Sequence, residues 1–82
     1  MQSESDVAAE MERVEEGDRV LWNGRSVPQV VTEVDEDSFV VEGNRGGHYR
    51  FFPNAPEGPT LTNLNSGRDW DVDDFKIALP SA

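Results

Sequence analysis

The sequence has no cysteine and only one histidine, His48. Without cysteine the chain can form neither a disulfide nor a thiolate zinc site, so no crosslink of that kind stabilises it. A single histidine also excludes most His-based metal sites and catalytic triads. The 82 residues must therefore fold around one modest hydrophobic core, as a single small domain.

Long apolar stretches are missing as well. The N-terminus is polar and acidic, whereas a secretory signal needs positive charge followed by an apolar run. No window of the sequence approaches the roughly 18 apolar residues of a membrane span. We therefore expect a soluble, cytoplasmic protein without a membrane partner.

Basic residues are scarce. The chain has 17 acidic residues against seven basic ones, and Lys76 is its single lysine. The net charge of −10 is larger than the magnitude of about 2–8 recommended for a small domain. Concentrated salt would screen the resulting self-repulsion. Such an excess of carboxylates resembles the proteins of haloarchaea, which keep molar salt in the cytoplasm; the alternative is an ordinary acidic protein of a low-salt cytoplasm.

Residues 1–16 are expected to form an acidic helix or tail. Val7, Met11 and Val14 recur at i, i+4 and i+7, which places them on one face of a helix. Gly17 is a suitable residue to stop this helix. Three residues can cap its start: Ser3, Ser5 and Asp6. Because about twelve residues are marginally helical alone, the segment must dock on a sheet or a partner, or fray.

Residues 17–82 are expected to form the main domain. Its first part holds four short runs rich in Val, Phe, Tyr and Trp, each closed by turn residues, which is the pattern of a β-meander. These four runs lie at residues 19–22, 29–34, 39–42 and 48–52, and further short runs follow at residues 60–64, 68–72 and 76–79. Five to six antiparallel strands joined by short turns cannot stay flat with two exposed edges. We therefore predict an all-β fold, a small SH3-like barrel preceded by a short helix. A five-stranded OB barrel is the rival fold, but no helical segment interrupts the middle strands here.

Period-2 alternation within the strands predicts which side chains form the core. In the run from His48 to Phe52, Tyr49 and Phe51 should point inward and Arg50 should point outward with Phe52. The full inward set is Val20, Trp22, Val30, Val34, Phe39, Val41, Tyr49, Phe51, Leu61, Trp70, Phe75 and Ile77.

No pattern in the chain indicates catalysis or a cofactor. Asp69, Asp71 and Asp73 have the spacing that opens an EF-hand loop, but Asp74 and Pro80 stand where that loop needs Gly and Glu. In a strand this spacing instead places three acids on one solvated face. The lone histidine has no oriented partner. We assign no catalytic residue, no metal and no cofactor, and we do not expect an enzyme.

Acidic residues are nearly absent from one long span. Between Gly43 and Arg68, Glu57 is the only acid. In a chain that otherwise covers itself with carboxylates, a partner can approach such a surface without repulsion. The predicted partner-binding residues are Arg45, His48, Arg50, Phe52 and Arg68.

The acid-poor span predicts a non-catalytic protein-interaction module whose partner is an unidentified protein, self-association included. The alternative is a barrel that binds RNA or single-stranded nucleic acid, because alternating arginine and aromatic residues suit phosphate contact and base stacking. The net charge of −10 disfavours a polyanionic partner. A further interpretation is that the span lacks acids only because its strands are buried.

Two short motifs resemble SH3-like barrels. The chain has Gly17-Asp18-Arg19-Val20 at its first strand, and Val72-Asp73-Asp74-Phe75-Lys76-Ile77 near its end. Such barrels often begin with a Gly-Asp-x-Val strand and place a one-turn 3₁₀ helix before the last strand. The resemblance covers roughly residues 17–79 and implies a fold but no activity. With the acidic composition, the chain resembles small haloarchaeal proteins of this fold. The first loop, Asn23-Gly24-Arg25, lacks the acids of proline-peptide SH3 domains, so that specificity is not carried over.

Overall fold

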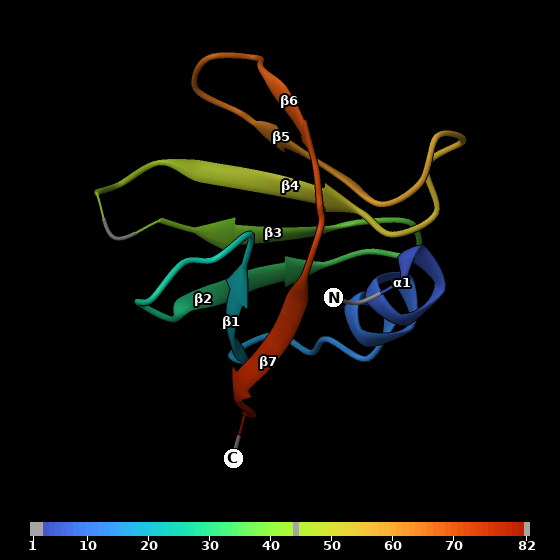
Figure 1. The fold of residues 1–82 in the computed structure, drawn as a ribbon. Helices are drawn as coiled ribbons and strands as arrows, with labels where there is room; N and C mark the ends of the chain where they lie inside the picture. Colours follow the sequence, from blue (N-terminus) through green and yellow to red (C-terminus); the bar gives the residue numbers. More distant parts are fainter. Residues whose placement is uncertain (1–2, 44, 82) are drawn as a thin grey trace.

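The computed structural model describes residues 3–43 and 45–81. These residues form one helix and seven strands (Figure 1). In chain order they are α1 (Glu4–Glu12), β1 (Arg19–Trp22), β2 (Gln29–Val34), β3 (Phe39–Glu42), β4 (His48–Phe52), β5 (Thr60–Asn63), β6 (Asp69–Asp71) and β7 (Phe75–Leu79).

All strand pairs are antiparallel, and the strands make one sheet in the order β6-β5-β4-β3-β2-β1-β7. The fold is therefore mostly β, as predicted, but the expected number of five to six strands was wrong. The described residues contain seven because the short run β6 pairs with β5 through Asp69 and Asp71, while β7 pairs separately with β1.

The connection from β6 to β7 shows how strongly the sheet curls. These two strands are the opposite edges of the sheet, yet only residues 72–74 separate them in the chain. Four residue steps span at most about 14 Å, whereas the edges of a flat sheet with six strand spacings would be about 29 Å apart. The sheet must therefore bend into a half-barrel, as Figure 1 shows.

Aromatic rings from four strands meet at the centre of the concave side. The Phe51 side chain is completely buried and stacks on Phe39 with ring centroids 4.9 Å apart. Trp22 meets Phe51 edge-on at 5.0 Å, and Phe75 also packs edge-on against both phenylalanines. This cluster explains why β1, β3, β4 and β7 present alternate residues to one side: the aromatic area buried there dominates the core.

Two predicted core residues are exposed, and a third faces the other way. Val34 and Trp70 are each 44% exposed. In β2 the pairing with β3 shifts between Val31 and Glu33, which is a β-bulge. The bulge interrupts the period of two, so Val31 is buried opposite Val41 while Val30 is only half-buried. Trp70 lies opposite the buried Leu61, on the predicted face, but β6 is the edge of the sheet and extends past the core.

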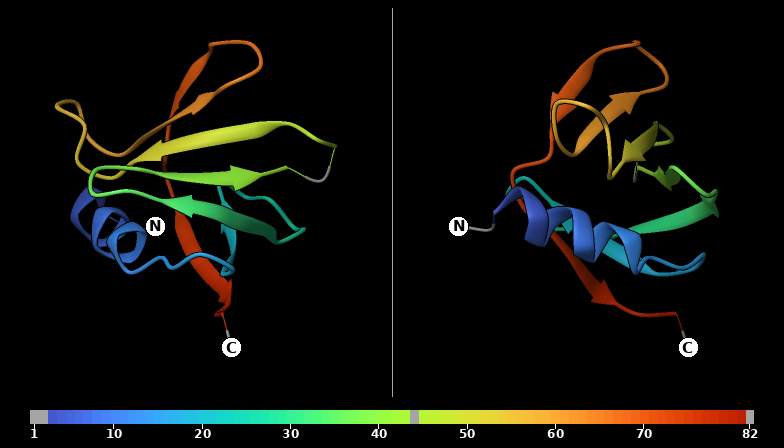
Figure 2. Two further views of the ribbon diagram at one scale, coloured as in Figure 1. Left: turned by 180° about the vertical axis from the view of Figure 1, so that it is seen from behind. Right: turned by 90° about the vertical axis from the view of Figure 1, so that its right-hand side faces the viewer.

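The N-terminal helix docks on the half-barrel and completes its core. Val7, Met11 and Val14 are buried in the same cluster as the strand residues. The helix lies at the end of the sheet where β2 turns into β3 and β4 leaves for β5 (Figure 2). The Glu10 carboxylate accepts a hydrogen bond from the Ile77 backbone amide of edge strand β7 at 3.3 Å. Docking thus stabilises a helix too short to persist alone and covers part of a sheet edge.

The helix boundaries differ from the sequence prediction. Ser3 is the N-cap, and its Oγ accepts a hydrogen bond from the Asp6 amide at 3.2 Å. The helix ends at Glu12 rather than running to Gly17. Gly17 has a positive φ of 93°, but it serves the turn that leads into β1, where its amide donates to the Val31 carbonyl.

Candidate binding hollow

The five residues predicted to bind a partner do not form one surface. Tyr49 and Phe51 of β4 lie opposite Asn63 and Leu61 on the concave side. His48, Arg50 and Phe52 alternate with them and therefore face the convex side. Their expected orientation is observed, since Phe51 is fully buried and Phe52 is half-exposed.

Arg50 is surrounded by acidic groups on the convex side. Its guanidinium forms ion pairs with Asp35 at 3.2 Å and Glu33 at 3.4 Å. It also donates to the Ser38 hydroxyl at 2.8 Å. Glu42, the acidic residue of β3, lies opposite His48 and not opposite Arg50. The charge of Arg50 is thus largely compensated within the molecule, although the surrounding sequence lacks acids.

Arg45 and Arg68 lie away from this convex surface. Arg45 belongs to the connection between β3 and β4 and lines a hollow on the concave side together with Tyr49. Arg68 is exposed in the turn between β5 and β6. Whether the five predicted residues contact a partner stays a prediction, but only His48, Arg50 and Phe52 share a face.

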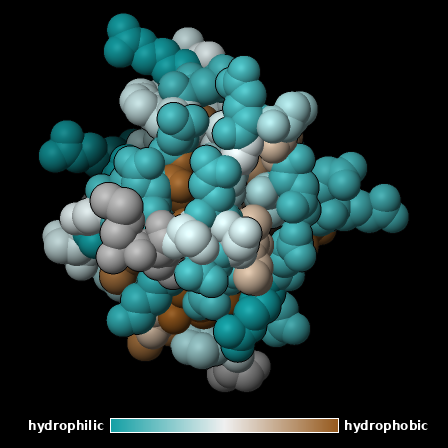
Figure 3. Space-filling model, turned by 45° about the vertical axis from the view of Figure 1, so that its right-hand side comes forward, coloured by the Kyte–Doolittle hydropathy of each residue, from teal (hydrophilic) through white to brown (hydrophobic). Residues whose placement is uncertain are grey.

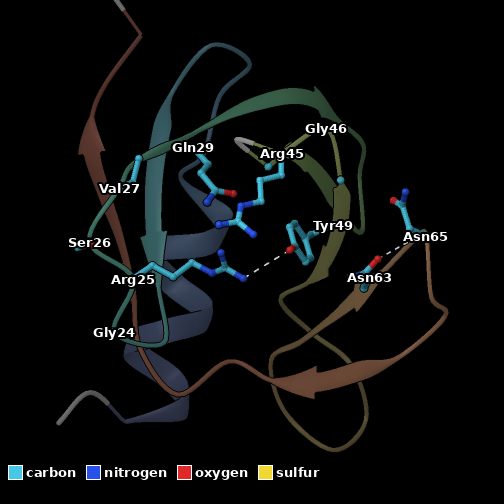
Figure 4. A pocket seen from close by; sticks show the side chains of 12 residues that line it. Gly24, Arg25, Ser26, Val27, Gln29, Arg45, Gly46, Tyr49, Asn63 and Asn65 are labelled. Carbon is cyan, nitrogen blue, oxygen red and sulfur yellow. Dashed lines mark hydrogen bonds between the residues drawn. The ribbon is translucent and has the colours of Figure 1, made fainter.

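The hollow that contains Arg45 has a volume of about 650 Å³ and lies between three connections at one end of the sheet (Figure 4). These are the β1–β2, β3–β4 and β5–β6 connections, at the opposite end from α1 (Figure 1). Its described lining is Gly24, Arg25, Ser26, Val27, Gln29, Gly43, Arg45, Gly46, Gly47, Tyr49, Asn63 and Asn65. We call this feature the concave hollow.

Arg25 forms one wall of the concave hollow. Its guanidinium carbon lies 4.5 Å from the centre of the Trp22 ring and 5.3 Å from that of Tyr49. Trp22 and Tyr49 meet edge-on at 5.5 Å, so the two rings form a fixed aromatic corner. Stacking holds the guanidinium in place through cation–π attraction and leaves its edge N–H groups to point elsewhere. One of these groups makes a long contact of 3.5 Å to the Tyr49 hydroxyl (Figure 4).

No acidic residue is among the described residues that line the concave hollow. Arg25 and Arg45 both extend into it beside Tyr49 (Figure 4). Within the described part of the chain, neither arginine has a carboxylate within 4.0 Å. Two uncompensated cations in an acid-free hollow are unexpected in a molecule with a net charge of −10.

The Gln29 amide adds an unsatisfied acceptor to the wall of the hollow. Gln29 is only 5% exposed, and its Oε1 is buried without a hydrogen-bond partner among residues 3–43 and 45–81. Buried acceptors of this kind are uncommon, because losing water without gaining a donor costs about 1–3 kcal/mol. The hollow therefore presents both cationic donors and one acceptor.

The turn before Arg25 is fixed by Asn23 and Gly24. Both have positive φ angles, 48° and 77°, as the central residues of a type I′ turn do. The Asn23 side chain donates to the Asp71 carbonyl at 2.8 Å and accepts from the Asp73 amide at 2.7 Å. These bonds attach the first connection to the segment after β6 and so position Arg25.

The β3–β4 connection is closed by its own backbone. The Gly43 amide donates to the Gly47 carbonyl at 2.6 Å, and the Gly46 amide donates to the Gly43 carbonyl at 3.1 Å. A side chain at Gly43 would lie within 3.2 Å of both the Gly47 carbonyl and the Tyr49 ring. Glycine therefore lets this connection approach the aromatic corner closely, and a larger residue would force the Gly47 carbonyl or the Tyr49 ring to shift.

Sequence reasoning missed Arg25 and Gln29 as site residues. A signal for them existed, because residues 19–32 contain no Asp or Glu. This second acid-free stretch folds against the acid-poor span from Gly43 to Arg68, and the two together line the hollow. Neither stretch alone indicates where they meet.

The remaining surface offers few other candidates. The face shown in Figure 3 is mainly hydrophilic, with hydrophobic atoms visible only in small separate areas. A second depression beside Phe52 and Trp70 is lined by three acids, Glu57, Asp69 and Asp71. Residues 3–43 and 45–81 hold no cluster of three or more His, Cys, Asp or Glu that could bind a metal ion. Within the same ranges, the helical part of the chain is too short and too polar to cross a membrane.

Comparison of the chain with models of protein families, with curated proteins and with solved structures finds no match.

Proposed function

We propose that this protein is a non-catalytic protein-interaction module that binds its partner through the concave hollow. The observation that carries the proposal is the pair of uncompensated arginines, Arg25 and Arg45, in an acid-free hollow of a strongly acidic molecule. An acidic domain gains nothing in its own stability from separating two cations from its 17 carboxylates. A ligand that supplies the missing negative charge explains the arrangement.

Binding fits the hollow better than catalysis does. Its described lining includes the hydroxyls of Ser26 and Tyr49 but no His, Asp, Glu or Lys that could act as a general base beside them. His48 faces the other side of β4. The lining thus supplies hydrogen bonds and charge, which are the means of recognition.

A protein partner fits better than a nucleic acid. A nucleic acid would be favoured by a continuous basic stripe, whereas Arg50 is paired with two carboxylates. The hollow itself can receive one or two anionic groups rather than a run of phosphates. Val27 at its rim is 51% exposed, and Leu64 in the neighbouring β5–β6 connection is 49% exposed. Covering these two apolar side chains would add favourable burial to a contact with a protein.

We further propose that the fold is an SH3-like barrel and that the protein works in a halophilic cytoplasm. The return of the last strand, β7, to pair with β1 supports the barrel assignment. Two features differ from the expected barrel. The β5–β6 hairpin is added to the other five strands, and residues 72–74 do not form the expected one-turn 3₁₀ helix before the last strand. The scarcity of lysine and the charge of −10 support the halophilic assignment.

Affinity capture from a native high-salt lysate of the source cells tests the proposed function. The wild-type chain should retain a protein that the double variant Arg25→Gln/Arg45→Gln does not. The matched control is Arg13→Gln/Arg19→Gln, which changes the net charge equally but alters two exposed residues outside the hollow. Equal recovery by wild type and the hollow variant would overturn the proposal, as would recovery of nucleic acid in place of protein.

A further inference from the structure

The side chains that line the concave hollow also indicate which chemical group it binds. We infer that it binds a carboxylate of an acidic peptide segment, held between Arg25 and Arg45. This inference rests on the proposed protein-binding function and specifies the recognised group. The first of the three observations below explains how Arg25 binds such an oxyanion, and the other two favour a peptide carboxylate over a phosphate.

The first observation is the orientation of Arg25. A guanidinium that lies flat over Trp22 and Tyr49 presents its N–H groups only along its edge. That planar edge matches the two oxygens of a carboxylate in a bidentate pair. Because stacking already fixes the side chain, little conformational entropy is lost when the ligand binds.

The second observation concerns the glycine-rich connection beside Arg45. Phosphate sites in such loops use a run of free backbone N–H groups. Here the amides of Gly43 and Gly46 already donate to carbonyls of the same connection. The Arg25 amide likewise donates to the Trp22 carbonyl. At least three backbone amides of these connections are therefore already engaged, and the positive charge of the hollow comes from the side chains of Arg25 and Arg45.

The third observation is the unsatisfied Gln29 Oε1, which needs a donor. A peptide brings backbone N–H groups together with its carboxylate, so it can satisfy the acceptor and the two arginines at once. Inorganic phosphate at neutral pH carries only one or two O–H donors on its four oxygens, so it matches the Gln29 Oε1 acceptor less well than a peptide with its backbone N–H groups does. The combination of two cations and one acceptor thus matches a short acidic peptide.

Isothermal titration of the full chain with defined probes tests this inference. The probes are an acetylated and amidated Gly-Glu-Gly-Glu-Gly peptide, its counterpart with Gln in place of Glu, and inorganic phosphate. The titrations are made in KCl at a concentration where circular dichroism shows the chain folded. The Glu peptide should bind at least tenfold more tightly than the Gln peptide and more tightly than phosphate, because charge-assisted pairs are the stronger ones.

Single variants locate the binding. Arg25→Gln and Arg45→Gln should each weaken Glu-peptide binding about tenfold, and the control Arg19→Gln should stay within about twofold of wild type. Equal affinity for the Glu and Gln peptides, or tighter binding of phosphate, would overturn the carboxylate assignment. If the lysate partner is lost in the hollow variant while the two peptides bind equally, the proposed function stands and only the carboxylate inference fails.

Discussion

Arg25 and Arg50 lie on the two sides of strand β4 and are held in opposite ways. Arg50, on the convex side, pairs with Glu33 and Asp35. Arg25, on the concave side, stacks on Trp22 and Tyr49 and has no carboxylate near it among the described residues. Arg50 is flanked by aromatic residues in the sequence and Arg25 is not, yet only Arg25 has charge left for a ligand. The comparison teaches that the neighbours across the sheet, not the neighbours along the chain, decide whether an arginine is available.

The largest expected effect tests the two sides of β4 directly. Phe51→Ala should lower the free energy of unfolding by about 3–5 kcal/mol, because it leaves a cavity in the aromatic core. Phe52→Ala should cost about 1–2 kcal/mol, since that ring is only half-buried. Urea denaturation of both variants measures the difference. Equal losses would mean that β4 does not separate a core side from an exposed side.

Salt should have the next largest effect, because carboxylates dominate the surface outside the hollow. Two like charges about 10 Å apart repel by about 0.4 kcal/mol in water, so several such pairs amount to about 2–3 kcal/mol. Thermal melts should therefore show higher midpoints in molar KCl than in dilute buffer. Asp37→Asn, which removes one exposed acid, should raise the midpoint in dilute buffer. Identical midpoints at both salt concentrations would make the acidic surface incidental.

Asn23 links the β1–β2 connection to the segment that follows β6. A substitution at Asn23 therefore tests how the position of Arg25 is stabilised. Asn23→Ala should lower the free energy of unfolding by about 2 kcal/mol, because it loses the side-chain hydrogen bonds and forces alanine into a positive φ. Asn23→Gly keeps the backbone conformation and should cost about 1 kcal/mol. Chemical denaturation compares them. A glycine variant as unstable as the alanine variant would show that φ contributes little.

The smallest stability effects come from the two arginines themselves. Arg25→Gln should cost about 0.5–1 kcal/mol for the lost cation–π contact. Arg50→Gln should cost about 1 kcal/mol or less, as is usual for partly exposed ion pairs. The two variants should differ, however, in how the loss of unfolding free energy depends on salt. Molar KCl should reduce the loss for Arg50→Gln, whose neighbours are charged, but not for Arg25→Gln. Denaturation at two salt concentrations measures this, and equal salt dependence would contradict the comparison.

Much of the fold was predictable from local patterns. Turn residues and β-rich runs located the strands, and Asn23-Gly24 identified its own turn type. Spacing at i, i+4 and i+7 identified the buried residues Val7 and Met11 of α1, and also Val14, which is buried just beyond the end of the helix. These predictions succeeded because each depends on residues a few positions apart, whose conformational preferences are local.

The errors arose where distant parts of the chain meet. The bulge in β2 buries Val31 instead of Val30, and it exists only because β3 pairs there. Trp70 points to the expected face but stays exposed because its strand is an edge of the curled sheet. A period of two along the chain carries no information about register or about edges.

The sequence by itself determined that this protein is an acidic, mostly β molecule with two stretches, residues 19–32 and 43–68, that nearly exclude carboxylates. Only the tertiary structure decided that these stretches meet at one end of the sheet, with Arg25 and Arg45 in the same hollow and Arg50 outside it. Composition fixes how many charges a chain has, whereas the curl and register of the sheet fix which charges are neighbours. Because the attraction between charges depends on their distance and surroundings, the binding properties of this chain follow from its curled sheet.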